Sequence, residues 1–284
     1  MNWMKHTPIY LLISALVIIP GIYSLARFGL KLSIEFTGGT RLSLNQVQNA
    51  DEVVTSFNAY SPTVESKSDQ SITIKTQTID QPTVQKQLDL LQTTNPNISL
   101  SDFETIGPAL GRETIFKTLN ALAIASLLLL VYISLAFKQF KYGVCAVLAM
   151  FHDTAVLLGT FSLLGHFFNI EVDLLFVTAV LTILSFSVHD TIVVYDRIRE
   201  LSKKNKGGSY ISLINQAVTE TMTRSLNNSL TIIFMLVALF LLGGESTRYF
   251  SLALLIGTIT GTYSSTFTAA PLLIVWDKFL GKRK

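Results

Sequence analysis

Long apolar runs separated by short polar segments dominate the chain and predict membrane-spanning helices. The runs cover residues 9–26, 118–137, 142–165, 172–195, 225–244 and 249–276. Each is about 18 residues or longer, and a helix of that length crosses roughly 30 Å of hydrocarbon. Asp153, Asp173 and Asp190 are the only acidic or basic residues in these runs. The pattern therefore predicts a membrane α-helical protein with six transmembrane helices.

Residues 31–113 follow a different pattern, in which short strand-like and helix-like stretches replace the apolar runs. Strands are predicted over 31–36 and 40–45, around a turn at 37–39, and over 63–67, 70–77 and 97–105. One helix is predicted over 49–60, and a second begins after Asp80, which has the character of an N-cap. We interpret the order as a βαββαβ, ferredoxin-like domain of the α+β class, inserted between the first two transmembrane helices.

Composition and charge support this division. Hydrophobic residues make up 49% of the 284 residues and charged residues only 14%, whereas soluble domains carry about 25% charged residues. Residues 31–113 hold ten acidic and six basic residues, a net charge of −4, and the rest holds nine and sixteen, a net charge of +7, which together give the overall +3. The composition argues against a soluble enzyme, and the net charge gives no reason to expect nucleic acid as a partner.

The positions of lysine and arginine predict the orientation. One side holds Lys5, Lys138, Lys141, Arg197, Arg199, Lys203, Lys204, Lys206, Lys278, Lys282, Arg283 and Lys284, and the short loops of the other side hold only Arg248. The basic side is cytoplasmic by the positive-inside rule. We therefore expect both termini inside and four domains: residues 1–30 (cytoplasmic N-terminus and first helix), 31–113 (periplasmic), 114–276 (five helices) and 277–284 (basic cytoplasmic tail).

The first apolar run has one alternative interpretation, as a cleaved signal peptide. Residues 24–26 (SLA) resemble a cleavage site. The run is longer than the apolar core of about 7–15 residues found in signal peptides, and Arg27 follows it directly. These features favour a retained transmembrane helix.

Nucleophile and metal sites have little support in the sequence. Cys145 is the only cysteine, and His152, His166 and His189 are dispersed, so neither a disulfide nor a zinc site is expected. We predict that the protein is not an enzyme and binds no metal or cofactor. In the outer domain, Gly38 and Gly39 are either a backbone site for an extended chain or a tight turn, and the turn is favoured.

Asp190 and Arg224 are the first candidate functional pair. Asp190 lies about 9 Å inside the cytoplasmic end of the fourth run at 1.5 Å per residue, and an ionisable group at that depth suggests a function by default. It is either a proton-binding carboxylate or a structural one capped by Ser187 or Thr191. Arg224 is either inside the fifth helix near Asp190 or an ordinary basic flanking residue; the pattern leaves this open.

Asp153 lies midway along the third run beside His152. The two are either a buried polar pair that holds helices together or a second relay group. Gly257 and Gly261, followed by two serines, are interpreted as a helix-packing motif. The basic loop at 203–208 (KKNKGG) could contact anionic membrane lipid, although topology alone explains its charge.

Several stretches together resemble the SecD/SecF family of protein-export membrane subunits, within the RND superfamily, over the whole chain. They are residues 36–40 (FTGGT), 106–111 (IGPALG), 152–153 (HD) with Gly159, 189–200 (HDTIVVYDRIRE), 223–225 (TRS), and 250–251 (FS) with Gly257 and residues 261–262 (GT). Each stretch alone is weakly specific, and their order and spacing make the set specific.

The resemblance implies half of an RND-type transporter, completed by SecD, which works with the SecYEG translocon in the bacterial cytoplasmic (inner) membrane. It implies that the proton gradient drives the completion of preprotein translocation. The family's functional pair corresponds to Asp190 and Arg224, and we add Asp153 and His189 to the expected proton-relay set. His189 stands where many members have asparagine. The alternatives are an RND-type exporter of small molecules or lipids, and a passive assembly subunit of the translocon.

Overall fold

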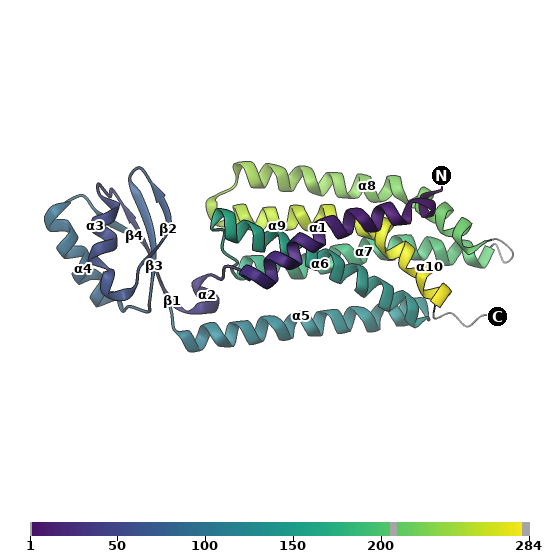
Figure 1. The fold of residues 1–284 in the computed structure, drawn as a ribbon, viewed down its shortest axis with the longest axis horizontal. Coiled ribbons are helices and arrows are strands. Elements are labelled where there is room, and N and C mark those ends of the chain that lie inside the picture. The colour runs from purple at the N-terminus through teal and green to yellow at the C-terminus, as the bar shows by residue number, and fades with distance from the viewer. Residues whose placement is uncertain (1, 205–208, 280–284) are drawn as a thin grey trace. The chain divides into compact units, whose positions relative to one another are not determined.

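The computed structural model describes residues 2–204 and 209–279, which divide into two compact units. The helix unit comprises Met1–Leu30, Ala121–Ile170 and Leu174–Lys284, and the sheet unit comprises Lys31–Asn120 and Glu171–Asp173 (Figure 1). Part of the predicted loop at 203–208 and most of the predicted tail at 277–284 lie outside the described residues. Residues 277–279 belong to the last helix.

Long helices form the helix unit. Its elements are η1 (Trp3–His6), α1 (Thr7–Phe28), α5 (Pro108–Phe137, which begins in the sheet unit), α6 (Phe140–Phe168), α7 (Leu174–Lys204), α8 (Tyr210–Leu242), α9 (Glu245–Ser264), the π-helix η3 (Ser265–Ala269) and α10 (Ala270–Phe279). Five helices of the described chain are long and apolar enough to cross a membrane: Trp3–Phe28, α5, α6, α7 and α8. The sixth predicted run falls across α9, η3 and α10, because the π-helix interrupts the α-helical hydrogen bonding.

Small residues allow the helices of this unit to approach closely. α1 and α6 cross at Gly21 and Gly159, where a Cβ on Gly159 would lie 2.5 Å from the Gly21 Cα. One turn on, the Ser24 and Ser162 hydroxyls hydrogen-bond at 2.8 Å. A Cβ on Gly261 of α9 would lie 3.3 Å from the Ser187 Cα of α7. The predicted role of Gly261 in helix packing is therefore confirmed.

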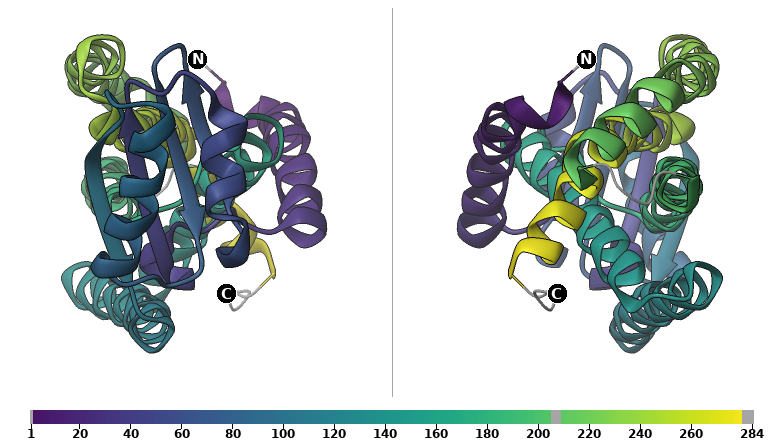
Figure 2. Two further views of the ribbon diagram at one scale, coloured as in Figure 1. Left: turned by 90° about the vertical axis from the view of Figure 1, so that its left-hand side faces the viewer. Right: turned by 90° about the vertical axis from the view of Figure 1, so that its right-hand side faces the viewer.

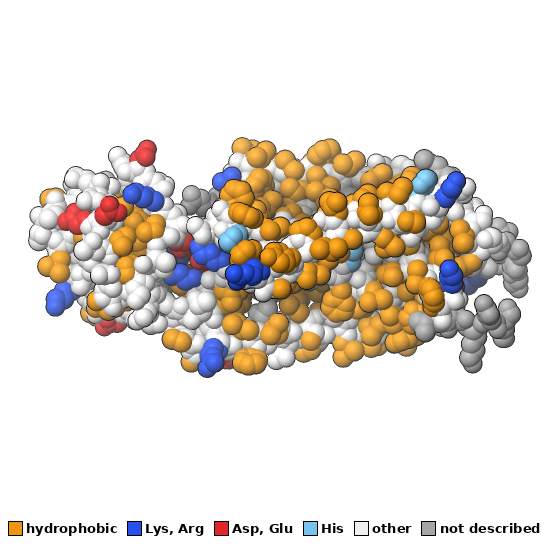
Figure 3. Space-filling model, viewed as in Figure 1, with side chains coloured by type: hydrophobic (Ala, Val, Ile, Leu, Met, Phe, Trp, Pro, Cys, Tyr) orange, Lys and Arg blue, Asp and Glu red, His pale blue; other side chains and the backbone are white. Residues whose placement is uncertain are grey.

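The helix unit also presents apolar side chains outward. Figure 3 shows hydrophobic side chains along the visible faces of its helices. Leu16, Leu135 and Leu242 are 71%, 71% and 87% exposed. Apolar surface on this scale suits hydrocarbon or a partner helix and not water.

The sheet unit has the predicted order of elements from its first strand onward. The elements are α2 (Ile34–Thr37), β1 (Gly39–Asn45), α3 (Ala50–Ser56), η2 (Asn58–Tyr60), β2 (Thr63–Ser68), β3 (Ser71–Thr76), α4 (Gln81–Thr94) and β4 (Ser99–Ile106). The strands form one sheet in the order β2-β3-β1-β4 with antiparallel neighbours. Figure 2 shows α3 and α4 on one face of it.

The alternation of side chains along the strands explains the core of the sheet unit. Leu42 and Leu44 of β1, together with Ile72 and Ile74 of β3, are at most 1% exposed. Residues two apart in a strand lie on the same face, so these side chains meet the apolar faces of α3 and α4. The polar residues between them lie on the other face.

The predicted strand over 31–36 is wrong. Ile34–Thr37 is a short helix, and the Gly38 N–H caps it by donating to the Ile34 carbonyl at 2.8 Å. Gly38 has φ of +72° and Gly39 of +131°, values that glycine adopts without strain. A Cβ on Gly38 would lie 2.7 Å from the Pro108 Cα. Gly38 therefore ends α2 close to Pro108, and Gly39 begins β1. The two glycines do not join two strands as predicted.

Candidate functional site

Two carboxylates are buried inside the helix unit. Asp153 of α6 is fully buried, and Asp190 of α7 is 2% exposed. Neither forms an ion pair with a lysine or arginine of the described chain. Burying an ionised carboxylate without a counter-charge costs several kcal/mol unless hydrogen bonds replace water. The donors around each carboxylate therefore decide what the site can do.

Both oxygens of Asp153 have partners. The Ser187 hydroxyl of α7 and the Ser264 hydroxyl of α9 each donate to Oδ2 at 2.6 Å. Oδ1 lies 3.0 Å from Nδ1 of His152, and Nε2 of that ring lies 2.9 Å from the Ser14 hydroxyl of α1. Asp153 thus connects four helices, and its partners suit an ionised carboxylate, which only accepts hydrogen bonds.

Asp190 has fewer partners. The Ser225 hydroxyl of α8 donates to Oδ2 in a short hydrogen bond, and the Ser265 hydroxyl donates to the same oxygen at 3.1 Å. Oδ1 accepts no hydrogen bond from the described residues. The carboxylate therefore keeps one oxygen on which a proton can be held without displacing either serine.

Ser264 and Ser265 join the two carboxylates through consecutive residues. Ser264 ends α9 and contacts Asp153, whereas Ser265 begins the π-helix and contacts Asp190. Each hydroxyl has a second acceptor on its own helix, namely the Gly261 carbonyl at 3.3 Å and the Thr262 carbonyl at 3.0 Å. Short π-helical turns occur frequently at functional sites.

Further hydroxyls extend this polar region. Thr262 donates to the Ser229 hydroxyl at 2.6 Å, and Ser229 donates to the Ser225 carbonyl at 3.0 Å. The buried hydroxyls of Thr191 and Thr268 have no hydrogen-bond partner in the described chain. The polar groups thus continue from Asp190 along α8 within an otherwise apolar bundle.

The other two predicted relay residues form no hydrogen bond with this network in the described chain, although both are close enough to Asp190 to interact with it electrostatically. His189 and Arg224 are exposed, and neither forms a hydrogen bond or ion pair within residues 2–204 and 209–279. The structure therefore brings together Asp153 and Asp190 through serines, and leaves His189 and Arg224 on the surface of this chain. No pair between Arg224 and Asp190 is formed.

Sequence reasoning missed most of the serines. Ser187 or Thr191 is predicted to cap Asp190, yet Ser187 donates to Asp153, and the Thr191 hydroxyl has no hydrogen-bond partner among the described residues. The two serines after Gly261 were assigned to packing alone, but both hydrogen-bond a carboxylate. A usable signal was present, because hydroxyl residues recur near the level of each aspartate in the neighbouring apolar runs.

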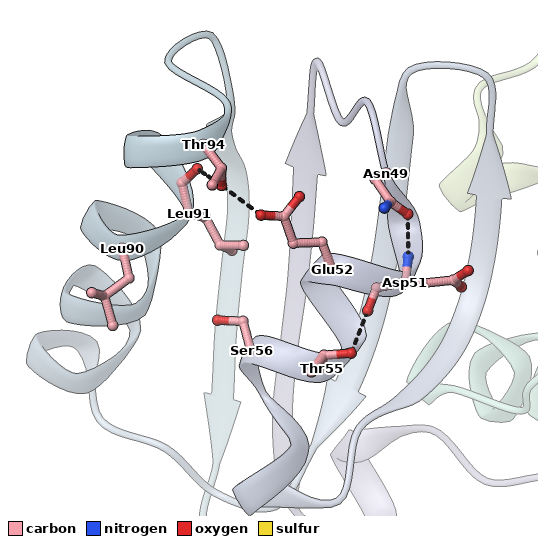
Figure 4. A pocket seen from close by; sticks show the side chains of 8 residues that line it. All are labelled: Asn49, Asp51, Glu52, Thr55, Ser56, Leu90, Leu91 and Thr94. Carbon is pink, nitrogen blue, oxygen red and sulfur yellow. Dashed lines mark hydrogen bonds between the residues drawn. The ribbon is translucent and has the colours of Figure 1, made fainter.

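A hollow of the sheet unit lies between its two main helices. It has a volume of about 540 Å³ and is lined by α3 and α4 residues (Figure 4). Some of its polar groups bond to one another: the Thr94 hydroxyl donates to Glu52 at 2.5 Å, and the Asp51 N–H donates to the Asn49 side chain at 3.1 Å. Gly38 and Gly39 are not among its lining residues.

Two partly buried carboxylates of the sheet unit are paired with cations. Glu171 lies 3.2 Å from the Lys75 ammonium and 3.6 Å from that of Lys31, and Glu65 lies 3.0 Å from the Arg41 guanidinium. Burial raises the pKa of Glu65 above its ordinary value of 4.5, and Arg41 opposes that rise.

Known proteins resemble the chain along almost its full length. The family model described as "Protein export membrane protein SecD/SecF, C-terminal" matches residues 86–279, and the SecD/SecF GG motif matches residues 23–45. The protein translocase subunit SecF of Thermobaculum terrenum is 41% identical over 289 residues, which cover 94% of this chain and 91% of that protein.

Two longer proteins are similar as well. The protein translocase subunit SecDF of Bacillus subtilis is 31% identical over 281 residues, covering 94% of this chain and 37% of that protein. The crystal structure of SecDF from Thermus thermophilus, described as a translocon-associated membrane protein, superposes with a TM-score of 0.85 at 29% identity. It covers 98% of this chain and 39% of that one.

Proposed function

This chain belongs to the SecD/SecF family of protein-export membrane proteins, and we propose that, as a Sec-pathway export subunit, it converts proton binding at Asp190 into movement of its helices. The observation behind this proposal is the pair of buried carboxylates, which contact serines and a histidine instead of a lysine or arginine.

The proposed setting is the bacterial inner membrane with both termini cytoplasmic. Six transmembrane segments form half of an RND-type transporter, and the sixth comprises α9, the π-helix and α10. The sheet unit is a ferredoxin-like domain on the periplasmic side. The excess of lysine and arginine in one set of connections supports this orientation.

Asp190 is the proposed proton-binding group. When its carboxylate is ionised, Oδ2 accepts from Ser225 and Ser265. Proton uptake at Oδ1 removes the negative charge and weakens both hydrogen bonds, since bonds to a charged acceptor are about twice as strong as neutral ones. α7 is then held less firmly to α8 and to the π-helix.

The consecutive serines carry that change to Asp153. A weakened bond lets the Ser265 hydroxyl turn fully to the Thr262 carbonyl, already 3.0 Å away. Ser264 is the preceding residue, so any rearrangement of the π-helical turn alters its bond to Asp153. Asp153 therefore acts as a fixed anchor of α1, α6, α7 and α9, and Asp190 as the group that changes charge.

Arg224 and His189 are proposed to act at the junction with SecD. Relatives in which SecD and SecF form a single SecDF chain imply SecD as the partner. Exposed, unpaired ionisable side chains on an apolar helix surface suit a face that another subunit covers. In the assembled complex Arg224 would then interact with the proton site together with groups from SecD.

The remaining partners are the SecYEG translocon and the preprotein. The sheet unit is proposed to hold preprotein on the periplasmic side while the helices move. One charge that crosses a potential of 100 mV supplies about 2.3 kcal/mol, so repeated proton uptake can drive repeated movement.

The test is preprotein translocation into vesicles that contain this chain, SecD and SecYEG, with and without a proton gradient. Asp190→Asn should reduce translocation to the level seen without the gradient, while SecD still co-purifies with the chain. Asp196→Asn, an exposed carboxylate further along α7, is the matched control and should retain the gradient effect. Full gradient-dependent translocation by Asp190→Asn would show that the subunit only assembles the translocon.

A further inference from the structure

A groove at one end of the helix unit is distinct from the carboxylate site. It has a volume of about 510 Å³ and lies where the N-terminal η1, the start of α8 and the end of α10 meet. The lining residues are Asn2, Met4, Lys5, Thr7, Ile211, Asn215, Pro271, Ile274, Val275, Lys278 and Phe279. No acidic residue is among them.

Hydrogen bonds fix the walls of this groove. The Met4 N–H donates to Oδ1 of Asn215 at 2.9 Å, and the Trp3 indole donates to the Thr219 hydroxyl at 2.9 Å, so η1 is held against α8. Met4 and Asn215 are both 7% exposed. The bond to Met4 also leaves the Asn215 amide nitrogen as a donor without a partner in the described chain.

The two lysines of the groove are uncompensated. Lys5 and Lys278 form no ion pair within the described residues, although Asp277 is the neighbour of Lys278 in the sequence. Both carboxylate oxygens of Asp277 lie 3.1 Å from the Lys141 ammonium, so this acid is already paired. The groove therefore presents ammonium and amide donors with no competing carboxylate.

Three apolar residues of the lining face outward. Ile211, Val275 and Phe279 are 48%, 44% and 75% exposed. Two cations beside exposed hydrocarbon, at the end of membrane-spanning helices, complement a phosphate joined to acyl chains. Basic pockets of this kind between helices bind anionic lipid headgroups, and lysine stems extend along hydrocarbon while the ammonium reaches the interface.

We propose that this groove binds one anionic phospholipid, with the phosphate between Lys5 and Lys278 and the acyl chains along Ile211, Val275 and Phe279. The lipid would connect the first and last elements of the helix unit. This proposal depends on the membrane setting of the helix unit and not on the use of protons, so either can fail without the other.

The positions of the tryptophans supply a direct test. The chain has two tryptophans, Trp3 and Trp276, and each is the sequence neighbour of a lining residue. The purified full chain is placed in micelles of phosphatidylcholine that contain a small fraction of phosphatidylglycerol. In one sample the phosphatidylglycerol has brominated acyl chains, and in the other the phosphatidylcholine has them. Brominated chains quench tryptophan fluorescence on contact.

We expect brominated phosphatidylglycerol to quench at about a thirtyfold lower mole fraction than brominated phosphatidylcholine, since each of the two lysines near the interface favours anionic lipid by about 1 kcal/mol and 1.4 kcal/mol corresponds to a factor of about ten. Lys5→Gln with Lys278→Gln should abolish this preference. Lys138→Gln with Lys203→Gln is the matched control, because it removes the same charge outside the groove, and it should retain the preference.

Three results would overturn the proposal. Equal quenching by the two lipids in the unchanged protein would mean that no selective site exists. An equal loss of the lipid preference in the control variant, Lys138→Gln with Lys203→Gln, would mean that general surface charge causes the preference. Displacement of the brominated lipid by soluble glycerol 3-phosphate would identify a site for a free phosphate instead of a lipid.

Discussion

The two units of this protein place different partners beside their least exposed carboxylates. In the sheet unit, Glu171 lies between two lysines and Glu65 lies against Arg41. In the helix unit, Asp153 and Asp190 have serines and a histidine as partners. An ion pair fixes the charge of both members, whereas a carboxylate held by hydroxyls can be neutralised without leaving an unpaired cation. The helix unit is therefore where we propose that a proton is exchanged.

The largest effect on stability is expected at Asp153. Asp153→Ala leaves the Ser187 and Ser264 hydroxyls and the His152 ring without their acceptor, and each such loss costs about 1–3 kcal/mol. Thermal unfolding of the full chain in detergent should show a loss of several kcal/mol. Asp102→Ala, at an exposed position of the sheet unit, is the control and should unfold as the unchanged protein does. Equal stability of the two variants would contradict the anchoring role of Asp153.

The next largest effect is expected at Ser265, which contacts Asp190, in comparison with a buried serine that contacts no carboxylate. Ser265→Ala removes a donor to Asp190, and a hydrogen bond to a charged group contributes about 1.5–3 kcal/mol. Gradient-driven translocation should fall about tenfold or more, by the same conversion of free energy into rate. Ser251→Ala is matched, because Ser251 is buried but donates only to the Thr247 carbonyl of its own helix. A similar decrease in both variants would mean that Ser265 contributes only to helix packing.

A smaller effect is expected where charges are paired. Lys75→Gln leaves Glu171 with only the longer contact to Lys31, at 3.6 Å. The loss should be about 1 kcal/mol for a partly buried pair, measured by hydrogen exchange of the β3 amides in the full chain. Lys67→Gln, which removes an exposed lysine of β2, should leave exchange unchanged. Faster exchange in Lys67→Gln alone would contradict the importance of the pair.

The smallest effect concerns Glu65 and pH. Its pKa in the folded protein is raised above 4.5, mainly by burial. The folded state therefore binds this proton more tightly than the unfolded chain, and the stability from that proton is lost as pH rises above about 4.5. Glu65→Gln removes this decrease, so its stability relative to the unchanged protein should rise as the pH increases through the weakly acidic range. Its stability at pH 7 should match or slightly exceed that of the unchanged protein. A fall in this relative stability with rising pH would reverse the assigned direction.

The local sequence pattern was sufficient to predict much of the fold. It was insufficient where packing between distant residues determines the local structure. Apolar runs identified the long helices, and alternation identified β1, β2, β3 and β4, because each depends on side chains close together in the chain. The segment 34–37 was assigned to a strand, yet Gly38 and Pro108 make it a helix end, and that contact spans about seventy residues. The π-helical turn was missed for a related reason: nothing in the residues 265–269 alone requires the extra residue in that turn.

The sequence by itself determined that Asp153 and Asp190 lie in membrane-length apolar segments, since hydropathy depends only on residue types and their order. It also determined the order of elements in the sheet unit after Gly39. Only the tertiary structure decided which donors meet each carboxylate. Four helices must come together before Ser187, Ser225, Ser264 and Ser265 can reach them, and hydrogen bonds need contact within about 3 Å. The tertiary structure likewise decided that Arg224 is exposed and forms no ion pair with Asp190 in the described chain.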